Sequence, residues 1–102
     1  MSQVSTQLEG STALLSLEGR TDLNLLGLKL FQSLIDGLDE VAVDANVTTV
    51  VLRGGGERAF SAGVDLHDMR DLTPQSAEEF IRTLHRAIRK VLTLPMPVIA
   101  AI

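Results

Sequence analysis

Residues 48–52 form a short run of β-branched and apolar residues that ends at Arg53 and three consecutive glycines. A strand with one face in water alternates apolar and polar residues, whereas a strand covered on both faces is apolar throughout. The run therefore predicts a buried strand of a parallel sheet. The glycines predict a loop at the carboxyl end of that strand.

The segments around this strand predict the rest of an α/β fold. Two runs of alternating residues on either side of Glu9-Gly10-Ser11 predict an opening β-hairpin. The residues that alternate with their neighbours are Val4, Thr6 and Leu8 in the first run, and Ala13, Leu15 and Leu17 in the second. Helical spacing from Leu25 to Val41 predicts a helix whose first N–H groups Asp22 or Asn24 caps. Strands that alternate with helices imply right-handed crossovers onto a mostly parallel sheet.

A second long helix is predicted to begin at Thr73-Pro74, with Ser76 and Glu79 as an alternative capping box. Its predicted buried stripe consists of Phe80, Leu84, Ala87, Ile88 and Val91. Pro95 and Pro97 end it. Residues 98–102 then predict another fully buried strand, and because no turn or polar tail follows, we expect the sequence to stop inside a domain.

Composition excludes several function classes. The chain has 102 residues and a net charge of −4 with both signs interleaved, so no basic face is expected to bind nucleic acid. Cys is absent, which excludes disulfides and thiolate chemistry. Neither a signal peptide nor an apolar stretch of about 18 residues is present. We therefore expect no membrane association, one folding unit over residues 1–102, and a cytoplasmic location.

The loop over residues 54–66 is the candidate site, because α/β folds bind ligands at the carboxyl ends of parallel strands. Gly54, Gly56 and Ala59 have dinucleotide-fingerprint spacing, which would favour a dehydrogenase, but the third small residue should open a helix. Ser61 and Gly63 partly match a nucleophile elbow without the triad order. A glycine-rich turn in which Phe60 fills the core is the structural alternative.

Three blocks of the sequence resemble the enoyl-CoA hydratase/isomerase (crotonase) family. They are residues 59–66 (Ala-Phe-Ser-Ala-Gly-Val-Asp-Leu) with residues 50–52 before them, residues 97–102 (Pro-Val-Ile-Ala-Ala-Ile), and the weaker pair Leu23-Asn24. The resemblance implies the crotonase-like ββα-spiral, with residues 1–102 as the N-terminal part of a single truncated domain.

The resemblance also implies roles for individual residues. The backbone N–H of Val64 would be one donor of an oxyanion hole, although the family often has Ala there. The carbonyl of Ala62 would meet the adenine of coenzyme A, and Asp65, Leu66 and His67 would continue the substrate-contact segment. His67 replaces a frequent Lys. Arg20 is a possible phosphate contact, although the family's Arg-Pro pair is not reproduced at Arg20-Thr21.

The implied activity is most nearly that of an enoyl-CoA hydratase, which adds water to a 2-enoyl-CoA thioester. Coenzyme A is then part of the substrate, and no cofactor or metal is expected. In the family the second oxyanion donor and the acid/base carboxylates follow the segment matched by residues 97–102, so residues 1–102 alone are expected to be inactive. A homotrimer or homohexamer is implied. Another crotonase reaction (isomerase, dehalogenase or synthase) and a non-catalytic CoA-binding or scaffold role stay open.

Three further polar residues have both a functional and a structural interpretation. Asp65 and Asp68 could form a catalytic carboxylate pair, but Asp beside a turn favours helix caps. His85 lies near Arg82, Arg86 and Arg89, which favours a solvated helix face over a ligand. No metal-ligand spacing is present in the sequence.

Overall fold

The computed structural model describes residues 2–102. Its elements follow the order strand, strand, helix, strand, short helix, long helix, strand: β1 (Gln3–Glu9), β2 (Thr12–Glu18), α1 (Leu28–Ala42), β3 (Thr49–Gly54), α2 (Leu66–Met69), α3 (Pro74–Thr93) and β4 (Val98–Ala101). The predicted hairpin, buried strand, two long helices and final strand are therefore confirmed. The single turn of α2 was not predicted.

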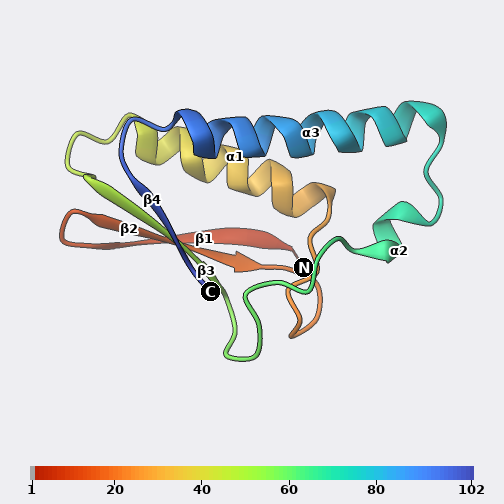
Figure 1. The fold of residues 1–102 in the computed structure, drawn as a ribbon, viewed down its shortest axis with the longest axis horizontal. Coiled ribbons are helices and arrows are strands. Elements are labelled where there is room, and N and C mark those ends of the chain that lie inside the picture. The colour runs from red at the N-terminus through yellow and green to blue at the C-terminus, as the bar shows by residue number, and fades with distance from the viewer. Residues whose placement is uncertain (1) are drawn as a thin grey trace.

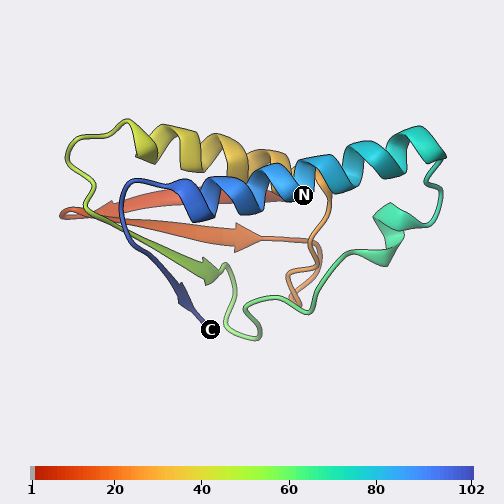
Figure 2. The same cartoon turned by 45° about the horizontal axis from the view of Figure 1, so that its top comes forward.

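The four strands form one sheet in the order β1-β2-β3-β4. β1 and β2 are antiparallel, and β2 pairs with β3, and β3 with β4, in parallel. The crossovers that contain α1 and α3 place both long helices on the same face of the sheet (Figures 1 and 2). The fold is thus α/β, with a mostly parallel sheet and an opening hairpin.

The core lies between this sheet and the two helices. Its larger cluster joins side chains of β2, α1 and β3, with Ala13, Leu15, Leu38 and Val50 completely or almost completely buried. Phe60 from the glycine-rich loop packs against this cluster, as the structural interpretation of the loop predicted. A second cluster joins α1 to α3 through Phe31 and Phe80, whose rings meet edge to face at 5.7 Å.

The predicted start of the first helix is wrong. α1 begins at Leu28 rather than at Leu25, and its N-cap, Gly27, offers no side-chain cap. Leu25 and Leu26 instead form isolated β-bridges with Arg20 and Val64. Hydrogen bonds of Leu25 to Arg20 in the same loop, and of Leu26 to the distant residues 63 and 65, therefore outweigh the helical spacing of these two leucines. Asp22 and Asn24 do not cap the helix.

The second long helix is confirmed with two corrections. Thr73 caps α3 in a capping box with Ser76, so the alternative box of Ser76 with Glu79 is wrong. Ile88 is 48% exposed, whereas Thr83 is buried. The packed stripe follows Phe80, Thr83 and Ala87 because this is the side of α3 that faces α1, and Ile88 lies outside it.

The prediction of a fully buried final strand is also wrong. Val98 is half-buried, and residues 99–101 are exposed. β4 is an outer strand that pairs only with β3 among the residues that the structure covers, which leaves residues 99–101 exposed within residues 2–102. No helix within residues 2–102 is long and apolar enough to cross a membrane.

Candidate functional site

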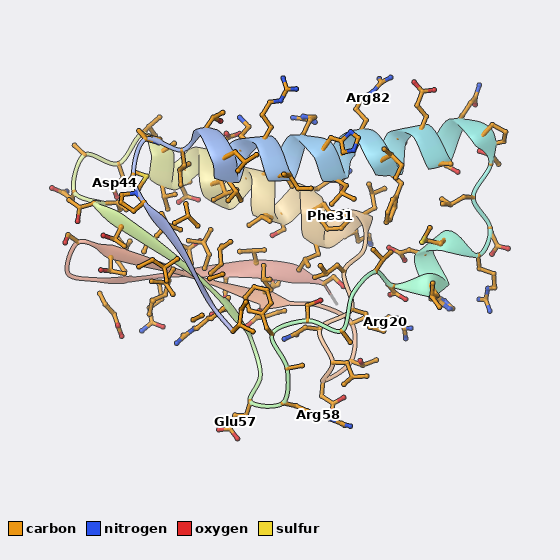
Figure 3. The ribbon with its side chains drawn as sticks, in the orientation of Figure 1. Arg20, Phe31, Asp44, Glu57, Arg58 and Arg82 are labelled. Carbon is orange, nitrogen blue, oxygen red and sulfur yellow. The ribbon has the colours of Figure 1, made fainter. Side chains whose placement is uncertain are left out.

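The candidate site lies where two loops meet at the carboxyl ends of parallel strands. Residues 19–27 follow β2, and residues 55–65 follow β3. Because β2 and β3 are parallel, both loops leave the same edge of the sheet and run side by side (Figure 1). Figure 3 shows Glu57 and Arg58 at the outer tip of the second loop. It shows Arg20, from the first loop, beside the segment that leads into α2.

Asn24 joins the two loops. Its side chain is buried, its φ is 52°, and its Oδ1 accepts from the Gly19 N–H at 3.2 Å. Its Nδ2 donates to the carbonyls of Ala59 at 2.9 Å and Phe60 at 3.3 Å. Asn adopts the left-handed conformation more readily than most residues. Asn24 is thus a connector inside the site rather than the helix cap that the spacing predicted.

The second loop is tied further along its length. The Ser61 hydroxyl donates to the Asn24 carbonyl at 2.9 Å and accepts from the Gly63 N–H at 3.0 Å. The Ala62 N–H donates to the Leu23 carbonyl at 2.9 Å. Ser61 therefore has a structural role here, which removes the nucleophile-elbow interpretation. The dinucleotide interpretation also fails, since no helix opens after Ala59 and the next one begins at Leu66.

Val64 lies in a short parallel bridge with Leu26. The Leu26 N–H donates to the Gly63 carbonyl at 2.9 Å, and the Asp65 N–H donates to the Leu26 carbonyl at 2.7 Å. In a trans peptide the N–H points opposite to the carbonyl of the same unit. Because the Gly63 carbonyl faces Leu26, the Val64 N–H points away from it. No residue among 2–102 accepts a hydrogen bond from the Val64 N–H, and Val64 is 36% exposed.

Asp65 and Arg20 form a two-point ion pair next to this bridge. Nε and Nη2 of Arg20 donate to the carboxylate at 2.7 and 3.1 Å. The Asp65 side chain is only 4% exposed, while that of Arg20 is 47% exposed. The hydrogen bond from Arg20, assisted by the His67 N–H, holds the pKa of Asp65 below its ordinary value against the opposing effect of burial, and Asp65 raises the pKa of Arg20.

Both Asp residues of this segment cap helices, as the cap interpretation predicted. Asp65 accepts from the His67 N–H at 2.9 Å at the start of α2. Asp68 accepts from the Leu28 N–H at 3.1 Å, so it caps α1 from a different part of the chain. Gly27 permits this contact, because a Cβ there would overlap the Asp68 carboxylate.

The other predicted site residues surround this core. Ala62 is exposed, and no donor to its carbonyl lies within the described chain. Leu66 is 76% exposed. His67 is exposed, with its Nδ1 3.2 Å from Nη2 of Arg70. His85 is exposed on α3, which confirms the solvated-face interpretation. Residues 2–102 contain no cluster of three His, Asp or Glu side chains that could hold a metal ion.

Two pockets flank the candidate site. One of about 480 Å³ opens beside the Arg20–Asp65 pair and is also lined by Leu28, Leu72 and Phe80. Another of about 260 Å³ lies between the glycine-rich loop and the end of β4. The site thus combines a free backbone donor, an ion pair whose carboxylate is buried, and adjoining concave surfaces. A larger pocket, about 720 Å³, lies on α3 and has none of the loop residues in its lining.

Sequence reasoning missed the connecting role of Asn24 and the ion pair of Arg20. The local signal at Asn24 was its position just before leucines with helical spacing, and this signal favoured a helix cap. A buried Asn with three side-chain hydrogen bonds can be recognised only when Gly19, Ala59 and Phe60 are brought together.

Comparison with known proteins gives a consistent result. A sequence model of the family described as enoyl-CoA hydratase/isomerase matches residues 7–102. A Thermus thermophilus protein, whose name places it among the enoyl-CoA hydratases, is 37% identical over an alignment of 97 residues that covers 92% of this chain. The short-chain-enoyl-CoA hydratase of Clostridium acetobutylicum is 28% identical over the whole chain.

Solved structures show the same fold. The crystal structure of an enoyl-CoA hydratase from Polaromonas sp. JS666 matches 98% of this chain with a TM-score of 0.90 and 30% identity. The chain spans 38% of the Thermus protein, 39% of the Clostridium enzyme and 40% of the Polaromonas chain. Both the sequence match and the shared fold lead to one conclusion: the chain belongs to the enoyl-CoA hydratase/isomerase (crotonase) family.

Proposed function

We propose that the full-length protein is an enoyl-CoA hydratase that adds water to a 2-enoyl-CoA thioester, with the Val64 N–H as one oxyanion donor. The observation that carries this proposal is the direction of that N–H. Hydrogen bonds tie the N–H groups of Ala62 and Asp65 to residues 23 and 26, and the Gly63 N–H to Ser61, whereas the Val64 N–H points away from Leu26 and has no acceptor within residues 2–102. Relatives named as enoyl-CoA hydratases support the choice of reaction.

The chemistry needs a donor of this kind. When water adds to the carbon–carbon double bond, negative charge develops on the thioester oxygen. A fixed backbone N–H stabilises that charge without reorganising, and loss of one such donor typically lowers the rate by ~10²–10³. The Val64 N–H is suited to this role because bonds on both sides hold its peptide, so the donor needs no reorientation when substrate binds.

The surrounding residues would contact the rest of the substrate. Ala62 offers an exposed carbonyl that can accept from the adenine amino group, and Leu66 and His67 lie exposed just beyond the donor. Nη1 of Arg20 takes no part in the hydrogen bonds to Asp65, so Arg20 retains a donor for a phosphate. Asp65 would contribute through its backbone, since its carboxylate is buried.

The remainder of the site is proposed to lie outside residues 1–102. We place this chain as the N-terminal part of a single crotonase-like domain, because it spans 40% or less of the relatives above. The second oxyanion donor and the acid/base carboxylates would come from the rest of that domain, so residues 1–102 alone would be inactive. The family resemblance supports a homotrimer or homohexamer, and no separate cofactor.

The test uses the full-length protein with 2-butenoyl-CoA, followed by loss of the enoyl absorbance. Val64→Pro removes the N–H without removing any hydrogen bond seen in the structure, and it should lower kcat by ~10²–10³. Val64→Ala keeps the N–H and should retain kcat within about threefold. In the wild-type protein, the amide signal of Val64 should shift with acetyl-CoA and not with free CoA, which lacks a thioester carbonyl.

Three results would contradict this proposal. Full activity of Val64→Pro would remove Val64 from the oxyanion hole. Binding of 2-butenoyl-CoA without loss of enoyl absorbance would identify a CoA-binding module. Conversion to a product other than the hydrated thioester would identify another crotonase reaction.

A further inference from the structure

We propose that Arg20 is a positioning residue, whose paired hydrogen bonds to Asp65 hold residues 63–65 against Leu26 and so set the direction of the Val64 N–H. This inference rests on the proposed function above, since it assigns Arg20 a role for the same donor. It is distinct from the phosphate contact, because the two guanidinium nitrogens used here face the protein.

The argument begins with a closed ring of contacts around the Val64 peptide. The backbones of Arg20 and Leu25 exchange two hydrogen bonds, at 3.1 and 2.9 Å. The next residue, Leu26, bonds to Gly63 and Asp65 at 2.9 and 2.7 Å. The Arg20 side chain then closes the ring onto the Asp65 carboxylate. Each end of residues 63–65 is thus held, and the peptide of Val64 lies inside the ring.

The Arg20 side chain supplies the only cationic partner of Asp65 in this ring. Among the residues that the structure covers, the Asp65 carboxylate otherwise accepts only from the His67 N–H. A buried carboxylate without its cation pays a large desolvation cost. Without the guanidinium, the Asp65 side chain is therefore driven toward water. Its backbone moves with it, and the bond to Leu26 weakens.

A small movement of this peptide is sufficient to affect the reaction. The Val64 N–H shares its plane with the Gly63 carbonyl, so release of that carbonyl from Leu26 rotates the donor. Misplacement of a catalytic group by about 1 Å can cost ~10² in rate. Arg20 is thereby expected to affect kcat through geometry, although it does not touch the reacting atoms.

The experiment compares Arg20→Gln, Arg20→Lys and Arg58→Gln in the full-length protein. Arg58 is the matched control, because it pairs with Asp22 across the same two loops, but both side chains are about two-thirds exposed. Amide hydrogen exchange at Leu26 and Asp65 measures the ring directly. Turnover of 2-butenoyl-CoA measures its consequence.

Arg20→Gln should accelerate exchange at both amides and lower kcat by about tenfold to a hundredfold. KM should rise as well if Nη1 of Arg20 contacts a phosphate, so the fall in kcat and the faster exchange are the readouts of the positioning role. Arg20→Lys keeps the charge but loses the two-point geometry, and should fall between Arg20→Gln and wild type. Arg58→Gln should match wild type. If Arg20→Gln does not fold, Arg20→Lys provides the same comparison with a smaller expected effect.

A raised KM with unchanged kcat, and unchanged exchange at Leu26 and Asp65, would overturn the proposal and leave Arg20 as a substrate contact. Absence of turnover in the wild-type protein would refute the hydratase function instead. In that case the exchange data would still decide whether Arg20 holds the Val64 segment.

Discussion

Replacement of Asn24 by Ala should strongly destabilise the two loops of the site. Asn24 is 4% exposed, and its side chain makes two good hydrogen bonds, at 2.9 and 3.2 Å, and a longer one at 3.3 Å. Loss of a buried hydrogen bond costs about 1 kcal/mol, and more when the partner stays unsatisfied. Two to three such bonds therefore amount to about 2–3 kcal/mol.

The backbone adds a second contribution. Asn24 has a φ of 52°, and an Ala in the left-handed region costs about 1 kcal/mol. The expected loss for Asn24→Ala is therefore about 3–4 kcal/mol. Asn24→Gly removes the same hydrogen bonds, but Gly adopts a positive φ without steric strain. This variant should therefore lose about 1 kcal/mol less than Asn24→Ala.

Urea unfolding of the full-length protein, followed by circular dichroism, measures these differences. The control is Asn46→Ala, because Asn46 is exposed and its side chain makes no hydrogen bond within residues 2–102. It should change the free energy of unfolding by less than about 0.5 kcal/mol. If Asn24→Ala is as stable as Asn46→Ala, Asn24 does not hold the loops together and the reasoning is refuted.

Two further changes test the same region. Gly54→Ala should lower the free energy of unfolding by about 1–3 kcal/mol, because the added Cβ would meet the backbone of Ala59 and Phe60. Gly56→Ala is the control and should be tolerated, because a Cβ there has nothing within 4 Å. Equal unfolding midpoints of the two variants would show that the close approach at Gly54 is unimportant. Asp65→Asn should destabilise the protein at neutral pH, and the difference from wild type should shrink on acidification. The pKa of Asp65 is lowered from 3.8, so its contribution is complete above that value and is lost as the pH falls through the lowered pKa. A difference in unfolding free energy that stays constant through this range would contradict the pairing.

The order of elements was predictable because local patterns determine it. Residues in the hairpin alternate, the run before Arg53 is continuously apolar, and Thr73-Pro74 carries a strong helix start. Each of these signals depends on neighbours within a few positions, where strand and helix periods differ. Residues 59–66 likewise indicated the family from the sequence, and the glycine-rich loop supplied the candidate site region.

Other features depended on contacts between distant segments. Leu26 lies in a run with helical spacing, yet its backbone bonds to residues 63 and 65. Asp68 caps a helix that begins 40 residues earlier in the chain. Local sequence gives no sign of such bonds, because they exist only after the sheet has brought the two loops to one edge.

The sequence by itself thus determined the α/β class, the order of elements along the chain and the loop that is the candidate site. The tertiary structure decided where α1 begins, which carboxylate caps it, and that the Val64 N–H points outward. The physical reason is that periodicity and turn chemistry act over a few residues, whereas the direction of one peptide depends on hydrogen bonds from Leu26, almost forty residues away.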